Sequence, residues 1–324
     1  MSKRLLALLA LSACNSATSN PAGVDAPLGH PADAPSGTTD APGTTTDAPI
    51  ASGTDPATDG TFAVTTATVT IPAGASRTAP ATTFVPTGAP SPRPLVFVSP
   101  GFQMARTQYT SYAHHLATWG FTVVLADYTD TSFFADHQQL ADDISLEITW
   151  ALAQTNLGID ATKIATAGHS LGGDISILVA ADDARVKAVI GWDPVDASSP
   201  AVIPKVPSLH AALAVIGETT DGAGGGMPCA PTAQNFHQFY LGAPSPALEM
   251  TVATADHMDW VDDPTCAFCT FCTAGTAPAD LARTATKRLN VAWLRKQFFA
   301  DGAMTSWLAA PPEVAAGTAT VTSK

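Results

Sequence analysis

Basic side chains are scarce in this chain of 324 residues. It contains 15 Lys and Arg against 28 Asp and Glu, which gives a formal net charge of −13. Affinity for nucleic acids comes mainly from Lys and Arg side chains that neutralise phosphates. The charge balance therefore argues against a general phosphate-binding surface, and we expect no nucleic acid among the partners of the protein.

The N-terminus lacks an apolar run long enough to span a bilayer. In "MSKRLLALLALSAC" a basic start is followed by apolar residues only from Leu5 to Leu11. This pattern predicts a signal peptide over residues 1–14. It resembles a bacterial lipoprotein signal, in which Cys14 would be lipidated and would anchor the protein to a membrane, facing the periplasm or the cell surface. An ordinary secretory signal cleaved nearby is the alternative, and either signal predicts export.

Residues 15–60 have no Lys or Arg and almost no large apolar side chain. They contain six Asp and repeat the tripeptide Asp-Ala-Pro four times. Such a segment has little surface to bury that would offset the entropy lost on ordering, and its prolines favour extended conformations. We predict a solvated tether that holds the following domain away from a membrane surface.

Beyond the tether, β-branched and apolar segments alternate with segments of helical spacing. The predicted strands are residues 62–71, 81–85, 94–99, 121–126, 163–168, 186–192, 209–217 and 247–255. The predicted helices are residues 109–120, 136–155, 174–181 and 281–300. This alternation is typical of the α/β class, so we expect one folded domain over residues 61–302, with a mostly parallel sheet and helices on both faces. The first two strands should lie antiparallel at an edge, and residues 303–324 should form a C-terminal tail.

One serine lies between glycines in "GHSLGG", directly after the predicted strand at residues 163–168. Ser170 is therefore expected at the carboxyl edge of the sheet, where open α/β sheets place ligand sites. Gly168 and Gly172 lack the Cβ atoms that would hinder a sharp turn. In this context the Gly-x-Ser-x-Gly pattern predicts a nucleophilic serine, and the alternative is a glycine-rich bend without catalytic role.

A serine hydroxyl is a weak nucleophile unless a base takes its proton, and histidine is the usual base. In α/β-hydrolases the chain order is serine, acid, histidine. Among the eight histidines, His257 in "TADHMDW" is the one in the loop that this order requires. Because a base must be neutral to act, activity is expected to fall in acid. The other histidines lie in the tether, before Ser170, or in and before the last predicted strands: His30, His114, His115, His137, His169, His210 and His237.

Two aspartates are candidates for the acid that orients the histidine. Asp193 follows the predicted strand at residues 186–192, and Pro194 ends that strand and leaves the carboxylate in a loop. Asp221 follows the next strand, which is the commoner location in this fold. Asp196 and Glu218 are weaker candidates.

An oxyanion formed on an ester carbonyl needs backbone N–H donors. Leu171, the residue after the serine, is one expected donor. The other is expected in "SPGFQ", residues 99–103, where Phe102 is the candidate and Gly101 lets the backbone approach closely. A plain Pro-Gly turn is the alternative interpretation of this loop.

The segments "PLVFVSPGF", "GHSLGG", "VIGWDPVDA", "PCAPTAQNFHQFY" and "DHMDWVDD" follow one another over about residues 93–299. In this order they resemble the chlorophyllases, α/β-hydrolases that split the phytyl ester of chlorophyll. The resemblance implies that the acid belongs to the Asp-Pro-Val segment, which favours Asp193, and that the histidine before Met-Asp is His257. Two positions depart from the family pattern, because Pro100 stands where chlorophyllases typically have His and Leu171 where they have Arg. The "SPGF" segment is similar instead to bacterial cutinases and polyester hydrolases.

Four cysteines lie near the proposed catalytic loops: Cys229, Cys266, Cys269 and Cys272. In an exported protein they are expected to form two disulfides, with three pairings open. A metal site made by the same four thiols is the alternative.

Together these features predict an exported serine esterase of the α/β-hydrolase fold that acts on an apolar or lipid-like ester and needs no cofactor or metal. Phe102, Trp192 and Trp260 are candidates for an apolar substrate pocket. A cutinase, lipase or polyester hydrolase of broad specificity is one alternative. A surface binding protein with a degenerate hydrolase domain is another.

Overall fold

A computed structural model of the chain describes residues 53–324 apart from 75, 198–199, 223–227, 266–267 and 279. The predicted signal peptide with Cys14, and the tether as far as residue 52, lie outside the described residues. No helix in the described part of the chain is long and apolar enough to cross a bilayer.

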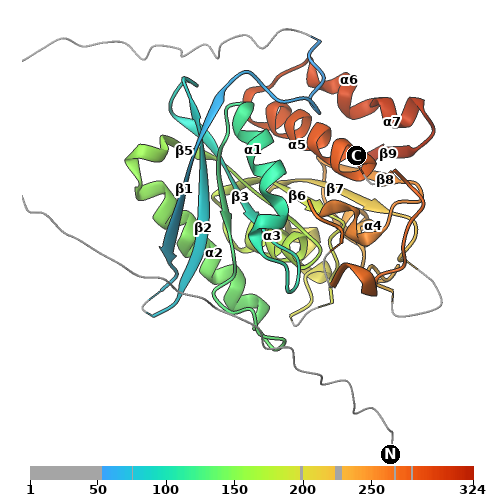
Figure 1. The fold of residues 1–324 in the computed structure, drawn as a ribbon, viewed down its shortest axis with the longest axis horizontal. Coiled ribbons are helices and arrows are strands. Elements are labelled where there is room, and N and C mark those ends of the chain that lie inside the picture. Colours follow the sequence, from blue (N-terminus) through green and yellow to red (C-terminus); the bar gives the residue numbers. More distant parts are fainter. Residues whose placement is uncertain (1–52, 75, 198–199, 223–227, 266–267, 279) are drawn as a thin grey trace, which may run out of the picture. The chain divides into compact units, whose positions relative to one another are not determined.

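Within the described residues nine strands form one sheet, in the order β1-β2-β4-β3-β5-β6-β7-β8-β9 (Figure 1). The six strands β3 to β8 run parallel to their neighbours in this group, and β1, β2 and β9 pair antiparallel at the two edges. The predicted mostly parallel sheet with an antiparallel edge is thus confirmed. The strands are β1 (Ala63–Pro72), β2 (Thr78–Thr87), β3 (Arg93–Ser99), β4 (Thr122–Ala126), β5 (Ile159–His169), β6 (Val186–Trp192), β7 (Ala212–Glu218), β8 (Ala247–Val252) and β9 (Ala319–Ser323).

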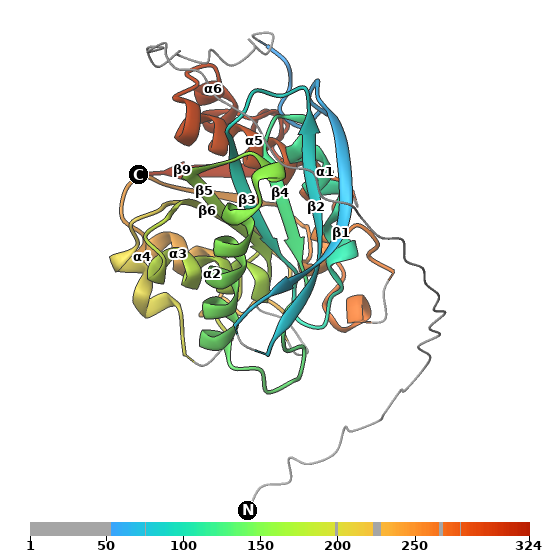
Figure 2. The ribbon, with the colours of Figure 1, turned by 90° about the vertical axis from the view of Figure 1, so that its left-hand side faces the viewer.

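Helices cover both faces of the sheet (Figures 1 and 2). On one face the apolar side chains of α1 (Thr110–Thr118), α5 (Leu281–Phe299) and α6 (Met304–Ala309) pack against the sheet. On the other face lie α2 (His137–Ala153), α3 (Leu171–Asp182) and α4 (Phe236–Gly242), and a short α7 (Pro312–Ala315) precedes β9.

The two faces use alternate residues of the central strands. In β3, Val96 and Val98 belong to the core under α1 and α5, whereas Leu95 and Phe97 belong to the core under α2 and α3. Because successive side chains of a strand point to opposite faces, a strand buried on both sides must be apolar throughout. The runs "PLVFVS" and "TVVLA" meet this requirement, and for this reason their sequences predicted the centre of the sheet.

The C-terminal segment is part of the domain. Residues 303–324, predicted as a tail, form α6, α7 and β9, and β9 pairs with β8 from Ala319 opposite Val252 to Ser323 opposite Leu248. This edge strand is short and mostly polar, so its sequence carries little apolar signal. The folded domain therefore extends past the predicted boundary at residue 302.

The other boundary differs in the same way. The carbonyl oxygen of Thr58 lies 3.0 Å from Nε2 of His115 and accepts a bond from the indole N–H of Trp119 at 2.9 Å. The carboxylate of Asp55 pairs with Arg288 on α5. Residues 53–60 were assigned to the tether by their composition, but they pack on the domain through hydrogen bonds and an ion pair. Such contacts leave no hydrophobic pattern in the sequence.

Candidate active site

The turn at Ser170 joins β5 to α3 and has a strained backbone. Ser170 has a φ of 55° and a ψ of −121°, which few residues with a Cβ adopt. A Cβ at Gly172 would lie 2.2 Å from the carbonyl oxygen of Ser99, and a Cβ at Gly168 would lie 2.5 Å from the backbone of Gly172. The two glycines are therefore required by close backbone packing around the turn, which leaves Ser170 half-buried at the carboxyl end of β5.

Three side chains form one hydrogen-bonded chain beside this turn. Nε2 of His257 lies 2.9 Å from Oγ of Ser170, and Nδ1 of His257 lies 2.6 Å from Oδ2 of Asp193. The three residues follow β5, β6 and β8, and parallel strands bring their carboxyl ends to one edge of the sheet. Asp193 is wholly buried and His257 is 5 % exposed. The arrangement is that of a nucleophile, a base and an acid that orients the base.

Asp193 leaves β6 through a tight turn. Its φ is 41°, and its N–H donates a hydrogen bond of 2.6 Å to the carbonyl oxygen of Ile216 in β7. Pro194 follows and cannot continue the strand. Burial raises the pKa of the Asp193 carboxyl, and the hydrogen bond from His257 acts in the opposite direction. The carboxylate of Asp193 is thus held out of water by the fold and paired with the imidazole of His257.

Asp221, the other candidate for the acid, also contacts His257, but at its backbone. Its Oδ2 accepts the N–H of His257 at 3.0 Å, and its Oδ1 accepts the N–H of Thr273 at 2.8 Å. The structure therefore places the carboxylate of Asp193 on the imidazole and the carboxylate of Asp221 on the loop that carries it. Asp221 is 1 % exposed, so both of its hydrogen bonds are shielded from water.

The weaker acid candidates hold neighbouring loops. Asp196 accepts hydrogen bonds from the N–H groups of Val202 and Ile203. Glu218 accepts the N–H of Asp221 at 2.8 Å, and its pKa is raised to about 8 by burial and by the charge of Asp193. Neither side chain contacts the ring of His257 through a hydrogen bond within the described residues.

The sequence around His257 explains how the loop is built. Residues His257–Trp260 form a short 3-10 helix, η4, whose N-cap is Asp256. The Asp256 side chain accepts the N–H of Met258 at 2.8 Å, and the Asp259 side chain accepts the N–H of Asp256 at 3.0 Å. This capping box satisfies donors at the start of the helix and fixes the backbone just where the histidine side chain leaves it.

His169, which chain order excluded as a base, lies beneath His257. It is 1 % exposed, and its ring centroid lies 4.7 Å from that of His257. Its Nδ1 lies 2.9 Å from the hydroxyl of Tyr109, which accepts the N–H of Gly101 at 3.1 Å. Burial and the charge of His257 lower the pKa of His169 well below its usual range. Through these contacts His169 connects the loop of His257 to the "SPGF" loop. The sequence indicated this role only by the position of His169 directly before Ser170.

The predicted oxyanion donors lie on the two segments next to Ser170. Leu171 is the first residue of α3, and Phe102 follows Gly101 in the loop after β3. No hydrogen bond to another described residue engages the N–H of Phe102 or of Leu171. Both residues line the cleft that contains Ser170 and stay the predicted donors to an oxyanion.

A cleft of about 470 Å³ opens over Ser170 and His257. Its apolar walls come from Phe102, Phe133 and Phe271. Trp192 and Trp260, predicted for this pocket, do not line it and are wholly buried.

Each of these tryptophans donates its indole N–H inside the core, Trp192 to Asn290 and Trp260 to Thr286. They are therefore structural residues: their large apolar surfaces fill the layer between the sheet and α5, which sequence alone could not distinguish from a pocket wall.

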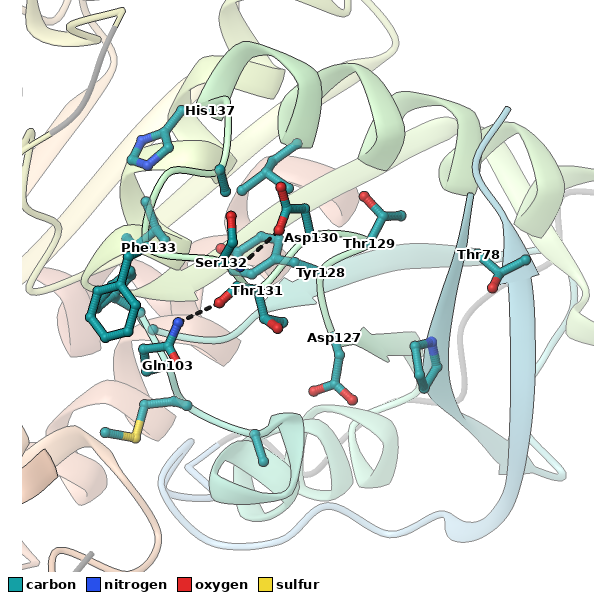
Figure 3. A pocket seen from close by; sticks show the side chains of 18 residues that line it. Thr78, Gln103, Asp127, Tyr128, Thr129, Asp130, Thr131, Ser132, Phe133 and His137 are labelled. Carbon is teal, nitrogen blue, oxygen red and sulfur yellow. Dashed lines mark hydrogen bonds between the residues drawn. The ribbon is translucent and has the colours of Figure 1, made fainter. Parts of the chain in front are cut away.

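A second cleft of about 490 Å³ adjoins the first and shares Phe102, Phe133 and Leu171 with it. Figure 3 shows the polar residues of its lining, which include Asp127, Asp130 and several side chains with hydroxyl groups. His137, at the start of α2, lines both clefts. Ser170 lines the first, more apolar depression, and its neighbour Leu171 lines both.

The remaining histidines are structural or remote from the cleft. The ring of His115 is buried against Thr58 and its pKa is lowered to about 4 by burial. His237 lies on α4 and contacts Glu249 at 2.7 Å. His210 was predicted to lie inside a strand, but it precedes β7, which begins at Ala212. His114 is an exposed residue of α1 and does not line the cleft.

Cys229 and Cys272 form a disulfide that lines the cleft, with Cα atoms 5.5 Å apart. This pair removes two thiols from the alternative four-cysteine metal site. Cys266 lies outside the described residues, so the second predicted pairing is not described. In the described part of the chain no cluster of three or more metal-ligating side chains is found.

The sequence model of the chlorophyllase family matches residues 54–320. The chain belongs to the chlorophyllase family. The match covers every described strand and helix except the last residues of β9, and it confirms the resemblance that the sequence segments predicted. Comparison with curated proteins gave no match.

Membership in the chlorophyllase family identifies the nine-stranded architecture as an α/β-hydrolase fold and indicates an ester hydrolase of that type. The additional similarity to cutinases, which rested on "SPGF", is not shown by these comparisons.

Proposed function

We propose that the protein is a serine carboxylic-ester hydrolase in which Ser170 is acylated and then deacylated by water. The observation that carries this proposal is the hydrogen-bonded chain from Ser170 through His257 to the buried Asp193. These three side chains lie at the carboxyl edge of the sheet, and Ser170 and His257 line a cleft with apolar walls. Ester hydrolysis through an acyl-enzyme needs these groups and no cofactor.

In the first half of the reaction, Nε2 of His257 removes the proton of the Ser170 hydroxyl while Oγ attacks the ester carbonyl carbon. The carbonyl oxygen becomes an oxyanion and receives hydrogen bonds from the N–H groups of Phe102 and Leu171. The carbonyl forms again as the bond to the alcohol oxygen breaks. The imidazolium of His257 gives its proton to that oxygen, and the alcohol leaves.

In the second half, water replaces the alcohol. His257 takes a proton from the water as its oxygen attacks the acyl carbon, and then returns the proton to Oγ of Ser170 as the carboxylic acid leaves. Throughout, the Asp193 carboxylate holds the Nδ1 proton of His257 and stabilises the imidazolium. Since Asp193 is wholly buried, this interaction is little screened by water.

The substrate that fits the Ser170 cleft is an ester with a large apolar group. Phe102, Phe133, Met258 and Phe271 give the cleft an apolar lining. We propose a chlorophyllase-like preference for such esters. Pro100 and Leu171 do not alter the backbone donors, so a broader lipase-like range of acyl groups is the alternative within the same chemistry.

The test is labelling of the full chain with a fluorophosphonate, which reacts with activated serines. We expect labelling of the parent, none for Ser170→Ala, and strong losses for His257→Ala and Asp193→Asn. Ser176→Ala is the matched control, because this serine lies in α3, the helix that follows Ser170, and its buried hydroxyl has no hydrogen-bond partner within the described residues. An unlabelled but folded parent would contradict the proposal and favour a binding protein with a degenerate hydrolase domain.

Hydrolysis of phytyl esters, short nitrophenyl esters and insoluble polyesters by the same preparations then defines the specificity. Preference for phytyl esters would support the chlorophyllase-like specificity. Comparable rates on all three substrates would support the broader, lipase-like specificity.

We also propose that the enzyme is exported and anchored to a bacterial membrane through Cys14. The support is the sequence pattern of residues 1–14. Incorporation of labelled palmitate into the chain, lost in Cys14→Ser, is the expected result. Equal incorporation in both would contradict the anchor.

A further inference from the structure

Exposed phenylalanines gather around the Ser170 cleft. Three of them, Phe102, Phe133 and Phe271, line the cleft, and Phe134 follows Phe133 in the chain with 96 % of its surface exposed. The exposed large apolar residues in the described part of the chain are Phe102, Phe133, Phe134, Leu146, Leu241 and Phe271. Three of the six therefore line one cleft, and a fourth is next to one of these three in the chain. We call Phe102, Phe133, Phe134 and Phe271 the phenylalanine rim.

The rim is fixed to the proposed catalytic groups. The rings of Phe102 and Phe133 meet edge to face with centroids 5.3 Å apart. The Gln103 side chain donates a hydrogen bond to the carbonyl oxygen of Thr131, which ties the loop before α2 to the oxyanion loop (Figure 3). Across the cleft, Phe271 precedes Cys272, which is bonded to Cys229. The apolar surface is thus held in place on both sides of the cleft.

Phe134 has no function inside the cleft. It does not line either depression, and almost its whole side chain is in contact with water. Exposed apolar surface of this kind is unfavourable in water, and patches of it mark interaction sites. A dissolved ester would reach Ser170 without touching Phe134, whereas a substrate that forms an extended apolar surface would cover it.

The charge around the rim indicates which surface it fits. Asp130 and Asp136, both exposed, flank the segment that carries Phe133 and Phe134. The chain as a whole has a formal net charge of −13. A negatively charged lipid surface would be repelled, so an uncharged apolar surface is the partner that this arrangement accepts.

We propose that the phenylalanine rim docks the Ser170 cleft onto the surface of an aggregated, uncharged ester, such as neutral lipid droplets. The inference rests on the proposed esterase function, because it identifies the physical form of the substrate of the same site. The rim enters the apolar phase, and ester molecules pass from that phase into the cleft.

The test measures the partition of the protein onto a trioctanoylglycerol emulsion. The full chain carries Cys14→Ser, so that no lipid anchor contributes, and Ser170→Ala, so that the surface is not hydrolysed. We expect Phe134→Ser to weaken partition about tenfold, since one phenylalanine leaves the apolar phase. Phe134→Trp should restore it. Leu241→Ser, which removes an exposed apolar side chain of α4 outside the rim, is the matched control and should change nothing.

Equal partition of Phe134→Ser and the parent would overturn the proposal, as would an equal loss in Leu241→Ser. Stronger partition after an anionic lipid is added to the emulsion would overturn the assignment of an uncharged surface. In the same chains with Ser170 intact, Phe134→Ser should slow hydrolysis of the emulsion and leave kcat/KM for a dissolved nitrophenyl ester unchanged. Absence of hydrolysis of the dissolved ester by the parent would overturn the proposed esterase function, while partition of the Ser170→Ala protein would still decide the docking proposal.

Discussion

Nε2 of His169 lies 2.8 Å from the carbonyl oxygen of His257. A carbonyl oxygen only accepts hydrogen bonds, so Nε2 of His169 carries the proton. With the ring neutral, Nδ1 is an acceptor and the Tyr109 hydroxyl donates to it, while that hydroxyl accepts the N–H of Gly101. The backbone of His257 and the loop that contains Gly101 are therefore connected through one buried neutral histidine.

Replacement of His169 tests this connection. His169→Phe removes the donor to His257 and is expected to lower kcat for a dissolved ester about tenfold, the effect of one lost buried hydrogen bond on the position of the base. KM should change little, because His169 lines the cleft and a phenylalanine ring fills much the same space there. His169→Gln retains an N–H donor and should recover part of the loss. Equal kcat in a folded His169→Phe would show that the contact does not position the base.

Two acids near His257 should respond differently to substitution. Asp193→Asn is expected to lower kcat by about four orders of magnitude, because the imidazole loses the acid that sets its tautomer. Asp221→Asn retains one acceptor and should lower the free energy of unfolding by about 2 kcal/mol with a much smaller effect on kcat. Chemical denaturation and ester hydrolysis of both variants measure the two effects. The reverse order of activity losses would assign the acid to Asp221.

The disulfide should stabilise the loop that holds the base. Cys272 precedes Thr273, whose N–H is bonded to Asp221, which in turn accepts the N–H of His257. Cys229→Ser combined with Cys272→Ser is expected to lower the free energy of unfolding by about 2 to 4 kcal/mol, since the bond closes a long loop of the unfolded chain. Thermal unfolding measures this loss. Activity that is unchanged well below the unfolding temperature would show that Asp221 holds the loop without help from the disulfide.

The buried carboxyl of Glu147 on α2 should make the free energy of unfolding fall as the pH rises from about 4.5 to about 8. It is 1 % exposed, one of its oxygens has no hydrogen-bond partner within the described residues, and its pKa is raised to about 8 by burial and by the nearby Asp143. Below the unfolded value of 4.5 the carboxyl is neutral in both states. As the pH rises toward 8, the unfolded chain releases this proton and the native chain keeps it, so unfolding becomes easier.

Glu147→Gln removes this titration. We expect the variant to be more stable than the parent by about 3 kcal/mol near pH 8, and nearly equal to it near pH 4. Denaturant unfolding at both pH values measures the difference. A constant difference at the two pH values would show that Glu147 affects packing and not proton binding.

The sequence predicted the central strands well because each has a mostly apolar run, as burial on both faces requires. It failed at the two ends of the domain. Residues 53–60 and β9 attach through backbone hydrogen bonds and ion pairs, which leave no apolar pattern. The short α4 was also not predicted, because its few apolar residues follow a loop rich in Pro and polar residues.

Pocket residues were harder to predict than catalytic ones. Trp192 and Trp260 have the composition of a pocket wall, but whether a large apolar side chain faces the core or a cleft depends on the packing of α5 against the sheet. Phe133 and Phe271 were not singled out, because a phenylalanine in a polar loop gives no sign of what lies opposite it.

The sequence by itself determined Ser170 and His257, because chain order and strand ends restrict which residues can reach one edge of a parallel sheet. It left Asp193 and Asp221 as candidates for the acid, and the family resemblance favoured Asp193. Only the tertiary structure decided that Asp193 contacts the imidazole of His257 and Asp221 its backbone. It also decided that His169 connects two loops and that phenylalanines from separate segments surround one cleft. The physical reason is that hydrophobic pattern and chain order are local properties, whereas hydrogen-bond partners and exposed surfaces arise where distant segments meet.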